Sequence, residues 1–596
     1  MKGAQSVEPY IEQIMQISGY ARAVLTALVL LRCALSMLQE KYEPEIWAYL
    51  ELPDGESLPI HHWECILGRS RSSDIRFNEG GVGLSHAALQ RSARGKWTVY
   101  DLHSRGGTWV NGELVHSHAR LRDGDTLRLS ELKLTFTPLS AEQRRTLQRK
   151  RQEPGRNYRQ GLTLLLLTNF QLFLMLEHCL TTPAEHLEAV EIAFGILMAL
   201  EWFCFFLFRA MGFKGFEVET LAFFLSSVGL SVTASSEPGG MLKACMLLML
   251  GTLFFALLGW WLRDLRRVKA LRWPMAFCAL AMLGLNLLLS EELFGARNWI
   301  TIGGISLQPS ELVKVAYVYA GAATLNRLFQ KRNLIMYVGF SAVIVGAMAL
   351  MGDFGTALVF FVCFLVVSYM RSGSFATTIL AVTGAAMAGV LVLTAKPYVA
   401  RRFASWGHVW DDPLGAGYQQ VRCMSATASG GLFGQGAGRG WLKKVPAADT
   451  DLVFGMVAEE QGLVVAFGCL AAIILLALFT VRNASAGRSS YYVIAGCAAV
   501  TIMMVQTALN VFGSLDILPF TGVTLPFVSR GGSSFVSCWA MLAYIKAGDT
   551  RQHASFALES ETADGDGEDG EAPMPGEADA GDDYYVDYTD DEEDDE

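Results

Sequence analysis

Long apolar segments follow one another through most of this 596-residue chain, and they constrain its fold more than any other feature. Each approaches the ~20 residues that a helix needs to cross a ~30 Å hydrocarbon core. The chain is 52% hydrophobic and only 18% charged, whereas soluble chains are about 25% charged. The sequence therefore predicts a polytopic α-helical membrane protein. We expect spans near 160–180, 188–208, 216–235, 240–262, 273–290, 309–328, 335–351, 355–371, 375–394, 453–480, 490–512 and 531–547.

An earlier apolar segment, residues 20–38, is interrupted by Arg22 and Arg32. It could cross the membrane or lie on it as an amphipathic helix, and a span is favoured. No small-residue cleavage site follows it, so we do not expect a cleavable signal. We assign residues 1–42 to an N-terminal apolar helix.

Residues 43–138 have a different character. Short alternating stretches such as WTVYDL and LRLSELKLTFT are separated by Gly, Asn and Asp turns. This pattern is typical of an all-β domain. A basic linker, residues 139–159, connects it to the first of the later spans.

Positive charge predicts the orientation of the spans. Lys and Arg gather in loops between alternate spans, and such loops face the cytoplasm in membrane proteins. The β domain and the C-terminal tail then lie on the cytoplasmic side. The basic loops are 263–272, 326–332, 370–373 and 481–488, and the loops expected to face outward are 291–308, 395–452 and 513–530.

The C-terminal tail, residues 549–596, differs from the rest of the chain in its charge. Nineteen Asp and Glu residues follow Arg551, with no Lys or Arg among them. The net charge of −10 therefore hides a basic body, which has 48 basic against 39 acidic residues. The tail is expected to be disordered. It could act as a solvated, repulsive segment or as a docking site for a basic partner.

Several ionisable residues lie in or beside the apolar spans, where charge is costly and usually functional. Glu311 falls in the first turn of a helix that Pro309 begins, and Lys314 lies on the same face three residues later. This pair could face a cavity or simply lock two helices together. Asp353 sits at an outward turn, and a further group comprises Asp449, Asp451, Glu459 and Glu460.

Five motifs occur in a fixed order: GARNWITIGGISLQPSELVK, GDFGTALVF, GYQQVRCMSATASGGLFGQGAG, DTDLVFGMVAEEQG and LPFTGVTLPFVSRGGSS. They resemble the signatures of the SEDS family (shape, elongation, division and sporulation proteins of the FtsW and RodA type). The resemblance implies a ten-helix core, here residues 213–548, with two extra transmembrane helices in 160–212. It also implies polymerisation of lipid II into glycan strands at the outer face of the bacterial cytoplasmic membrane, with a class B penicillin-binding protein as partner.

The same resemblance implies roles for individual residues. Asp451, after Thr450, matches the family's catalytic aspartate, and Asp449 is expected to be a solvated loop residue. Glu459 and Glu460 match a glutamate pair expected to support the cavity. Residues implied in substrate binding are Arg297, Trp299, Gln308, Ser310, Glu311, Lys314, Asp353, Lys443, Glu459 and Glu460.

The expected chemistry explains why a carboxylate is needed at the membrane boundary. A sugar hydroxyl needs a base within reach, and desolvation raises a carboxylate pKa toward a useful value. The leaving pyrophosphate needs cations, which Arg297, Lys314, Lys443, Lys444 or a divalent ion (Mg or Mn) could supply. The chain departs from the family at Asn298, Arg422, Cys423 and Arg530, which concerns substrate details.

Residues 65–129 carry LGRSRSSDIRF, VGLSHAALQ and YDLHSRGGTWVNGELV, and resemble a forkhead-associated (FHA) domain, a β-sandwich that binds phosphothreonine peptides. Arg69 matches the phosphate-contacting arginine, whose guanidinium suits a phosphate, and His86 matches a loop-ordering histidine. Gly83 and Gly106 stand where the family has a phosphate-binding serine and an asparagine. The remaining candidates for a phosphopeptide site are Ser70, Ser85 and Asn111.

Two readings of the FHA domain stay open, namely phosphothreonine binding and a degenerate fold that binds an unphosphorylated partner or only positions the membrane domain. For the whole chain, a flippase for lipid-linked precursors and a non-catalytic scaffold of a division or elongation complex are the alternatives to a polymerase. No feature suggests a nucleic-acid partner.

Overall fold

The computed structural model describes residues 8–550 apart from gaps at 40–44, 71–72, 93–94, 141, 144–145, 148–158, 214, 294–295, 303–304, 326–330, 373–374, 396, 485 and 488. All described residues belong to the first unit of the chain, Met1–Ala557. The expectations for the acidic tail beyond Thr550 and for most of the basic linker therefore lie outside the described residues.

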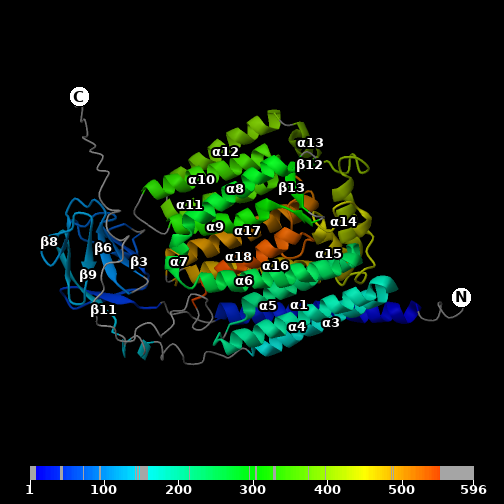
Figure 1. The fold of residues 1–596 in the computed structure, drawn as a ribbon, viewed down its shortest axis with the longest axis horizontal. Coiled ribbons are helices and arrows are strands. Elements are labelled where there is room, and N and C mark those ends of the chain that lie inside the picture. The colour runs from blue at the N-terminus through cyan, green and yellow to red at the C-terminus, as the bar shows by residue number, and fades with distance from the viewer. Residues whose placement is uncertain are drawn as a thin grey trace. The chain divides into compact units, whose positions relative to one another are not determined.

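The β domain is a two-sheet structure, as the sequence predicts. Its strands are β1 Ala48–Glu51, β2 Ser57–Ile60, β3 Glu64–Gly68, β4 Ile75–Arg76, β5 Ala87–Arg91, β6 Trp97–Asp101, β7 Thr108–Val110, β8 Glu113–Leu114, β9 His118–Leu121, β10 Thr126–Leu129 and β11 Leu132–Pro138. One sheet has the order β2-β1-β11-β10-β7-β8 and the other β4-β3-β5-β6-β9. Figure 1 shows this domain in blue, with β3, β6, β8, β9 and β11 labelled.

Alternating side chains build the core of this domain. In β11 the side chains of Leu132, Leu134 and Phe136 are buried and that of Lys133 is exposed, because successive residues of a strand point to opposite faces. Phe136 meets Trp97 edge to face, with ring centroids 5.5 Å apart. The periodicity read from LRLSELKLTFT therefore decides which face is inside.

Most of the remainder of the first unit is helical. Its helices are α1 Glu8–Gln39, α3 Gln160–Thr181, α4 Ala184–Ala210, α5 Glu217–Ser236, α6 Met241–Trp261, α7 Leu265–Ala270, α8 Arg272–Leu289, α9 Pro309–Leu325, α10 Lys331–Leu350, α11 Phe354–Ser372, α12 Phe375–Ala395, α13 Pro397–Ser405, α14 Tyr418–Gly430, α15 Val453–Gln461, α16 Leu463–Ala484, α17 Ser490–Ser514 and α18 Gly532–Ala547, with 3₁₀ turns η1 Pro238–Gly240 and η2 Leu442–Lys444. Among the described residues, eight helices are long and apolar enough to cross a membrane, or nine if the bent α12–α13 pair counts as one span. The predicted polytopic helical protein is confirmed.

Helices α5, α17 and α18 form the interior of the bundle. Nearly every residue of α5 is buried, and it packs against α3, α4, α6 and α16. The hydroxyls of Ser227 and Ser231 accept hydrogen bonds from the side-chain amides of Gln171 in α3 and Gln461 in α15. Polar contacts of this kind hold helices together where no hydrophobic driving force acts between them.

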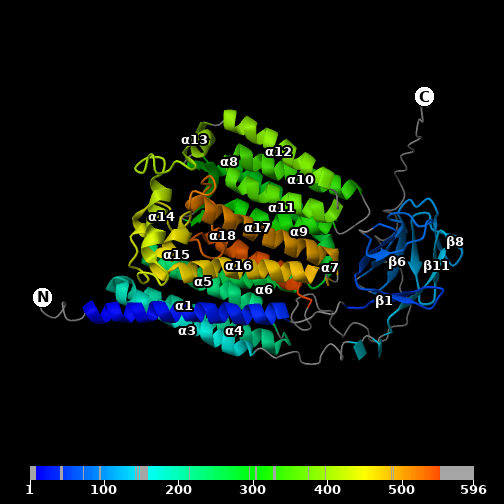
Figure 2. The same ribbon diagram turned by 180° about the vertical axis from the view of Figure 1, so that it is seen from behind.

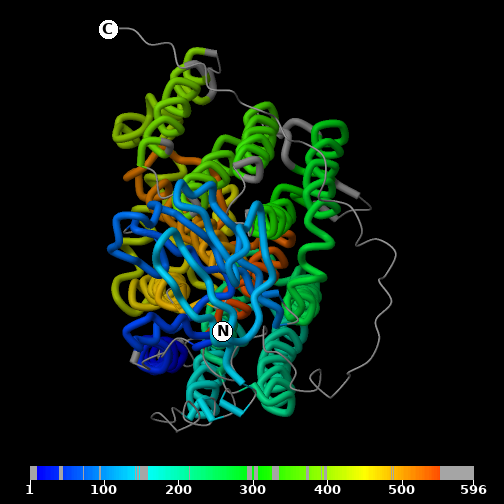
Figure 3. The backbone as a smooth tube through the Cα atoms, turned by 90° about the vertical axis from the view of Figure 1, so that its left-hand side faces the viewer, coloured from blue at the N-terminus to red at the C-terminus, as the bar shows by residue number. Residues whose placement is uncertain are grey.

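Helices α1, α3 and α4 lie together along one side of the bundle (Figures 1 and 2). Figure 3 looks roughly along the helices and shows the blue α1 beside the cyan α3 and α4. Helix α1 packs against α3, α5 and α16, and Tyr10–Leu38 meets the length and hydropathy of a span. Residues 20–38, which could cross the membrane or lie on it, thus belong to one long helix that packs within the bundle.

Two features differ from the sequence-based expectations. The loop 291–308, expected to face outward, holds a small sheet, β12 Glu291–Leu293, β13 Ala296–Ile302 and β14 Ile305–Leu307. The single span predicted at 453–480 is wrong, because α15 ends at Gln461 and α16 begins at Leu463. Gly462 between them has φ +91°, a conformation that favours glycine, and the backbone of Leu432 and Gly434 packs directly against it.

Candidate functional site

A mainly apolar cavity of about 550 Å³ lies where β13, α9, α11, α13, α17 and α18 meet the loop before α15. Ligand sites are commonly cavities of this size with a few converging polar groups. Its polar and aromatic lining includes Trp299, Glu311, Asp353, Arg402, Asp451 and Arg530.

Asp451 belongs to this lining, and the backbone around it is held by three partners. The Asn510 side-chain amide donates to the Asp451 carbonyl oxygen at 3.2 Å. The Ser529 hydroxyl donates to the Thr450 carbonyl oxygen at 2.6 Å, and the Arg530 backbone N–H donates to the Asp449 carbonyl oxygen at 2.8 Å. The position of the carboxylate is therefore fixed by α17 and by the segment before α18, both remote in sequence.

Burial raises the pKa of Asp451 to about 6. Desolvation disfavours the charged form of a carboxyl group, and the neighbouring charges of Asp449 and Asp353 act in the same direction. The Thr450 hydroxyl and the Arg402 guanidinium oppose the shift. A carboxylate with this pKa is largely ionised at neutral pH and is still basic enough to accept a proton.

Asp449 is not the solvated loop residue that the sequence suggested. Its carboxylate is 16% exposed and lies 2.6 Å from an Arg530 guanidinium nitrogen. Arg530 also pairs with Glu237, the residue that precedes η1. That expectation was wrong because the cation comes from a segment 81 residues away, which no local pattern reveals.

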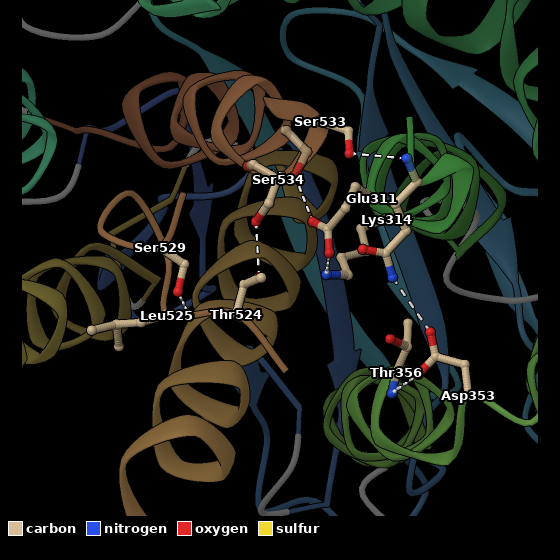
Figure 4. A network of polar contacts seen from close by, with 11 residues as sticks. Glu311, Lys314, Asp353, Thr356, Thr524, Leu525, Ser529, Ser533 and Ser534 are labelled. Atoms are coloured by element: carbon tan, nitrogen blue, oxygen red, sulfur yellow. Dashed lines mark hydrogen bonds and ion pairs between the residues drawn. The ribbon is translucent and has the colours of Figure 1, made fainter. Parts of the chain in front are cut away.

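The predicted pair at the start of α9 is confirmed. Lys314 Nζ lies 2.7 Å from Glu311 Oε1, and both side chains are almost completely buried. The Ser537 hydroxyl donates to the other Glu311 oxygen at 3.1 Å. Glu311 lines the cavity, whereas Lys314 is not part of the described lining and pairs with Glu311. Figure 4 shows this pair.

A polar network continues from this pair to α11. The Gln308 amide donates to Asp353 at 3.4 Å, and Asp353 accepts the Thr356 backbone N–H at 3.0 Å, as a capping residue does. On the other side the Ser534 and Thr524 hydroxyls are 3.0 Å apart (Figure 4). The ends of α9, α11 and α18 at the cavity are thereby tied together.

The other predicted site residues are not all at the cavity. Ser310 is fully buried, but it is not part of the described lining. Arg297 lies in β13, but its side chain lies outside the described residues. The substrate-binding roles predicted for the whole set stay predictions.

Glu459 and Glu460 face the loop that precedes η2, away from the cavity. Glu459 accepts the backbone N–H groups of Trp441 and Leu442 at 2.9 and 3.0 Å. Glu460 accepts the Gly438 N–H at 3.0 Å, and Lys443 donates to the Gly438 carbonyl oxygen. These three charged residues therefore hold the loop before η2 in place.

Arg402 and Asn510 are the site residues that the sequence reasoning missed. Arg402 belongs to an Arg-Arg pair in a loop expected to face outward, where basic residues are unusual. Asn510 is a buried amide within an apolar helix, a rare and usually functional occurrence. Both signals are present in the sequence and could have been used.

A divalent ion at this site would need converging oxygen ligands. Among the described residues, no group of three or more His, Cys, Asp or Glu side chains could hold a metal ion. Magnesium is often held by only one or two carboxylates together with substrate phosphates, so the divalent ion stays a prediction.

The β domain carries only some of the side chains that the FHA family uses to bind a phosphate. Arg69 and Ser85 are exposed and Ser70 is half-buried. The His86 ring is fully buried and bonds Gly83 N–H and Gly107 O at 3.0 Å each, which confirms its loop-ordering role.

Asn111, also predicted for the phosphopeptide site, is used within a turn. Its φ is +52°, its amide donates to Asp125 at 2.9 Å, and its carbonyl oxygen accepts the Thr126 N–H at 2.9 Å. Both ends of the side chain are thus engaged in the domain itself.

Together these features define a polytopic membrane protein with a buried carboxylate in a mainly apolar cavity and an added β-sandwich. The family model for FtsW, RodA and SpoVE, described as "Cell cycle protein", matches residues 196–552, and the FHA domain model matches 65–130. The chain belongs to the FtsW/RodA/SpoVE family and contains an FHA domain.

Two named relatives agree with this assignment. The probable peptidoglycan glycosyltransferase FtsW of Borreliella burgdorferi is 30% identical over 273 residues, which are 43% of this chain and 72% of the relative. Peptidoglycan glycosyltransferase RodA of Mycobacterium bovis is 29% identical over 316 residues, 50% and 67% of the two chains. The solved rod shape determining protein RodA of Thermus thermophilus is 25% identical, covering 56% of this chain and 95% of its own, with a TM-score of 0.42. The predicted family and its peptidoglycan glycosyltransferase class are confirmed.

Proposed function

We propose that this protein polymerises lipid II into glycan strands, with Asp451 as the general base. The observation that carries the proposal is the placement of Asp451 in the cavity, with its backbone fixed by Asn510 and Ser529 and its pKa raised to about 6 by burial. Relatives of this family bear the name peptidoglycan glycosyltransferase.

The reaction joins a sugar hydroxyl to an anomeric carbon that carries a lipid pyrophosphate. The Asp451 carboxylate takes the hydroxyl proton as the new C–O bond forms, and the bond to the pyrophosphate breaks. The pyrophosphate leaves as an anion on its lipid. A base positioned for this proton transfer contributes about 10²–10⁴-fold to a rate.

Arg402 and Arg530 supply positive charge at the cavity wall. Arg402 acts on Asp451 through its charge, and Arg530 is held by Asp449 and Glu237. Guanidinium groups suit phosphate oxygens because their N–H donors form a planar fork. The apolar wall of the cavity fits a substrate whose lipid stays in the bilayer.

The cavity is assigned to the outer face of the membrane, and the FHA domain to the cytoplasm. Glu64 of β3 accepts the N–H of Ser490, the first residue of α17, at 3.0 Å, whereas Asn510 near the other end of α17 holds Asp451. The β domain and the cavity therefore lie at opposite ends of one long helix. The basic loops of the chain favour the cytoplasm for the end at the β domain.

The decisive experiment replaces Asp451 by Asn and follows glycan polymerisation from lipid II by the purified full-length protein with its class B penicillin-binding partner. Asp411→Asn is the matched control, because this carboxylate lies in the same loop, is exposed and is not part of the cavity lining. We expect Asp451→Asn to abolish polymerisation and Asp411→Asn to retain most of it. Continued strand synthesis by the Asp451 variant would reject the assignment, and would favour a flippase or a scaffold instead.

For the FHA domain we propose docking of a protein partner through the loop face that carries Arg69 and Ser85, with weak dependence on phosphate. Both residues are exposed, and Leu84 beside them is 64% exposed. Gly83 offers no hydroxyl to a phosphate. Titration of the full-length protein with matched phosphorylated and plain threonine peptides tests this, and a large preference for the phosphorylated form would contradict it.

A further inference from the structure

Helices α1 and α3 lie before the region that the family model covers, residues 196–552. They nevertheless contact the segment between α14 and α15, which we call the glycine loop and define as residues 433–443. The Tyr20 and Phe433 rings meet edge to face, 4.5 Å apart. A Cβ atom at Gly436 would lie 3.0 Å from the Met15 sulfur. The N-terminal half of α1 is therefore packed closely against this loop.

A fully buried ion pair joins the two N-terminal helices at the same level. Arg22 Nε of α1 lies 2.9 Å from Glu177 Oε1 of α3, and neither side chain is exposed at all. Such a pair needs good geometry and further hydrogen bonds to offset the loss of hydration. The ion pair orients the Glu177 carboxylate and leaves its other oxygen directed at the glycine loop.

Ala437 in the glycine loop receives contacts from α3 on both its backbone groups. The second Glu177 oxygen accepts the Ala437 N–H at 2.7 Å. The Thr181 hydroxyl lies within hydrogen-bond distance, 3.1 Å, of the Ala437 carbonyl oxygen. Helix α3 thus holds this residue of the loop from one side, with Glu177 itself held by Arg22.

The loop needs such support because its own backbone is permissive. Gly434, Gly436 and Gly438 have φ values of +83°, +103° and +78°, and glycine loses the most conformational freedom when it is ordered. On the opposite side the loop is held by Glu459 and Glu460 of α15. The loop is clamped between the added helices and the family core, and it leads through η2 to Asp451.

We propose that Glu177, oriented by Arg22, is a positioning residue for the polymerase reaction. It acts by fixing the glycine loop, and through that loop the approach to Asp451. The proposal rests on the function proposed above. It gives the helices that precede the family region a role at the catalytic end of the protein, beyond anchoring the chain.

Two double variants separate the hydrogen bond from the buried charges. Arg22→Met with Glu177→Gln removes both charges and keeps an oxygen for the Ala437 N–H. Arg22→Met with Glu177→Met removes the same charges and also the acceptor, with a side chain of nearly the same size. Removing both charges together avoids an unpaired buried ion, which would destabilise the fold by itself.

We expect the Met/Met variant to have a kcat about 10- to 100-fold below that of the Met/Gln variant, because small misplacements at a reacting centre have effects of this size. The apparent KM for lipid II and the melting temperature should be similar in the two variants. Equal kcat in the two variants would overturn the proposal, provided that wild-type protein is active and Asp451→Asn is not.

A second measurement does not depend on activity. Amide hydrogen exchange over 433–443, measured on the full-length protein in lipid nanodiscs, should be faster in the Met/Met variant than in the Met/Gln variant. Equal exchange would show that Glu177 does not hold the loop, whatever reaction the protein catalyses.

Discussion

The side chain of Asn510 donates a hydrogen bond to the backbone carbonyl of Asp451, over a distance of 3.2 Å. The same amide donates to the Val523 carbonyl oxygen at 2.8 Å. One buried residue of α17 thus links the loop that carries Asp451 to the segment that leads into α18. The position of Asp451 depends on an amide that lies 59 residues away in the sequence.

Replacing Asn510 by Leu should lower both activity and stability. The change leaves buried carbonyl groups without their donor, which costs about 1–3 kcal/mol, and frees the Asp451 backbone. We expect at least about a tenfold lower polymerisation rate. Rate and melting temperature are measured together, with Asn169→Leu as control, since the exposed Asn169 amide donates to Leu165 of its own helix. Wild-type activity in the Asn510 variant would refute this role.

The polymerisation rate should depend on pH through Asp451. The base acts when ionised, and its pKa is raised to about 6 by burial. The rate should therefore be constant above about pH 7 and fall roughly tenfold per pH unit below 6. A pH–rate profile at saturating lipid II tests this, and a rate that stays constant down to pH 5 would contradict it.

The Arg402→Ala variant should shift the same profile. The arginine charge favours the ionised carboxylate and so lowers the Asp451 pKa. Without that charge the pKa rises further, and the falling limb of the profile should move to higher pH. A profile that stays in place, or moves to lower pH, would show that Arg402 does not act on the base.

The Gly462→Ala variant should be destabilised, and its rate should fall. Gly462 has φ +91°, and an alanine there is strained and also presses on the backbone of Leu432 and Gly434. A strained backbone position of this kind costs about 1–3 kcal/mol. Gly339→Ala is the control, because a Cβ there meets nothing within 4 Å. Equal melting temperatures for the two variants would contradict the expectation.

The FHA face offers a gain-of-function test. A Cβ at Gly83 would approach His86 no closer than 3.7 Å, so Gly83→Ser should fold normally and restore a phosphate donor. One charge-assisted hydrogen bond contributes about 1.5–3 kcal/mol, or roughly tenfold or more in affinity. Calorimetric titration with a phosphothreonine peptide measures this gain.

Gly106→Asn is the contrasting variant in the same domain. A Cβ there would lie 2.5 Å from the Ser130 Cβ atom, so this change should destabilise the domain and bring no gain in affinity. If Gly83→Ser also leaves the peptide affinity unchanged, then Arg69 is not directed at a phosphate.

Local patterns were sufficient for much of this protein. Apolar length determines which segments are helices in a membrane, and alternation determines the strands of the β domain. The Glu311–Lys314 pair follows from helix geometry alone, because residues three apart share a face. Ordered motifs were sufficient to predict the family, and they make Asp451 the candidate base among its acidic neighbours.

Other features of the protein are visible only in the tertiary structure, because they depend on contacts between segments far apart in the chain. Asp449 pairs with Arg530, the helix breaks at Gly462, and Glu459 and Glu460 accept hydrogen bonds from a loop backbone. No local pattern identifies the partners in these contacts. The same holds for Arg22, Glu177 and Ala437, which come from three separate parts of the sequence. In a medium of low polarity a buried charge must find its partner wherever the fold places one, and only the fold identifies which partner that is.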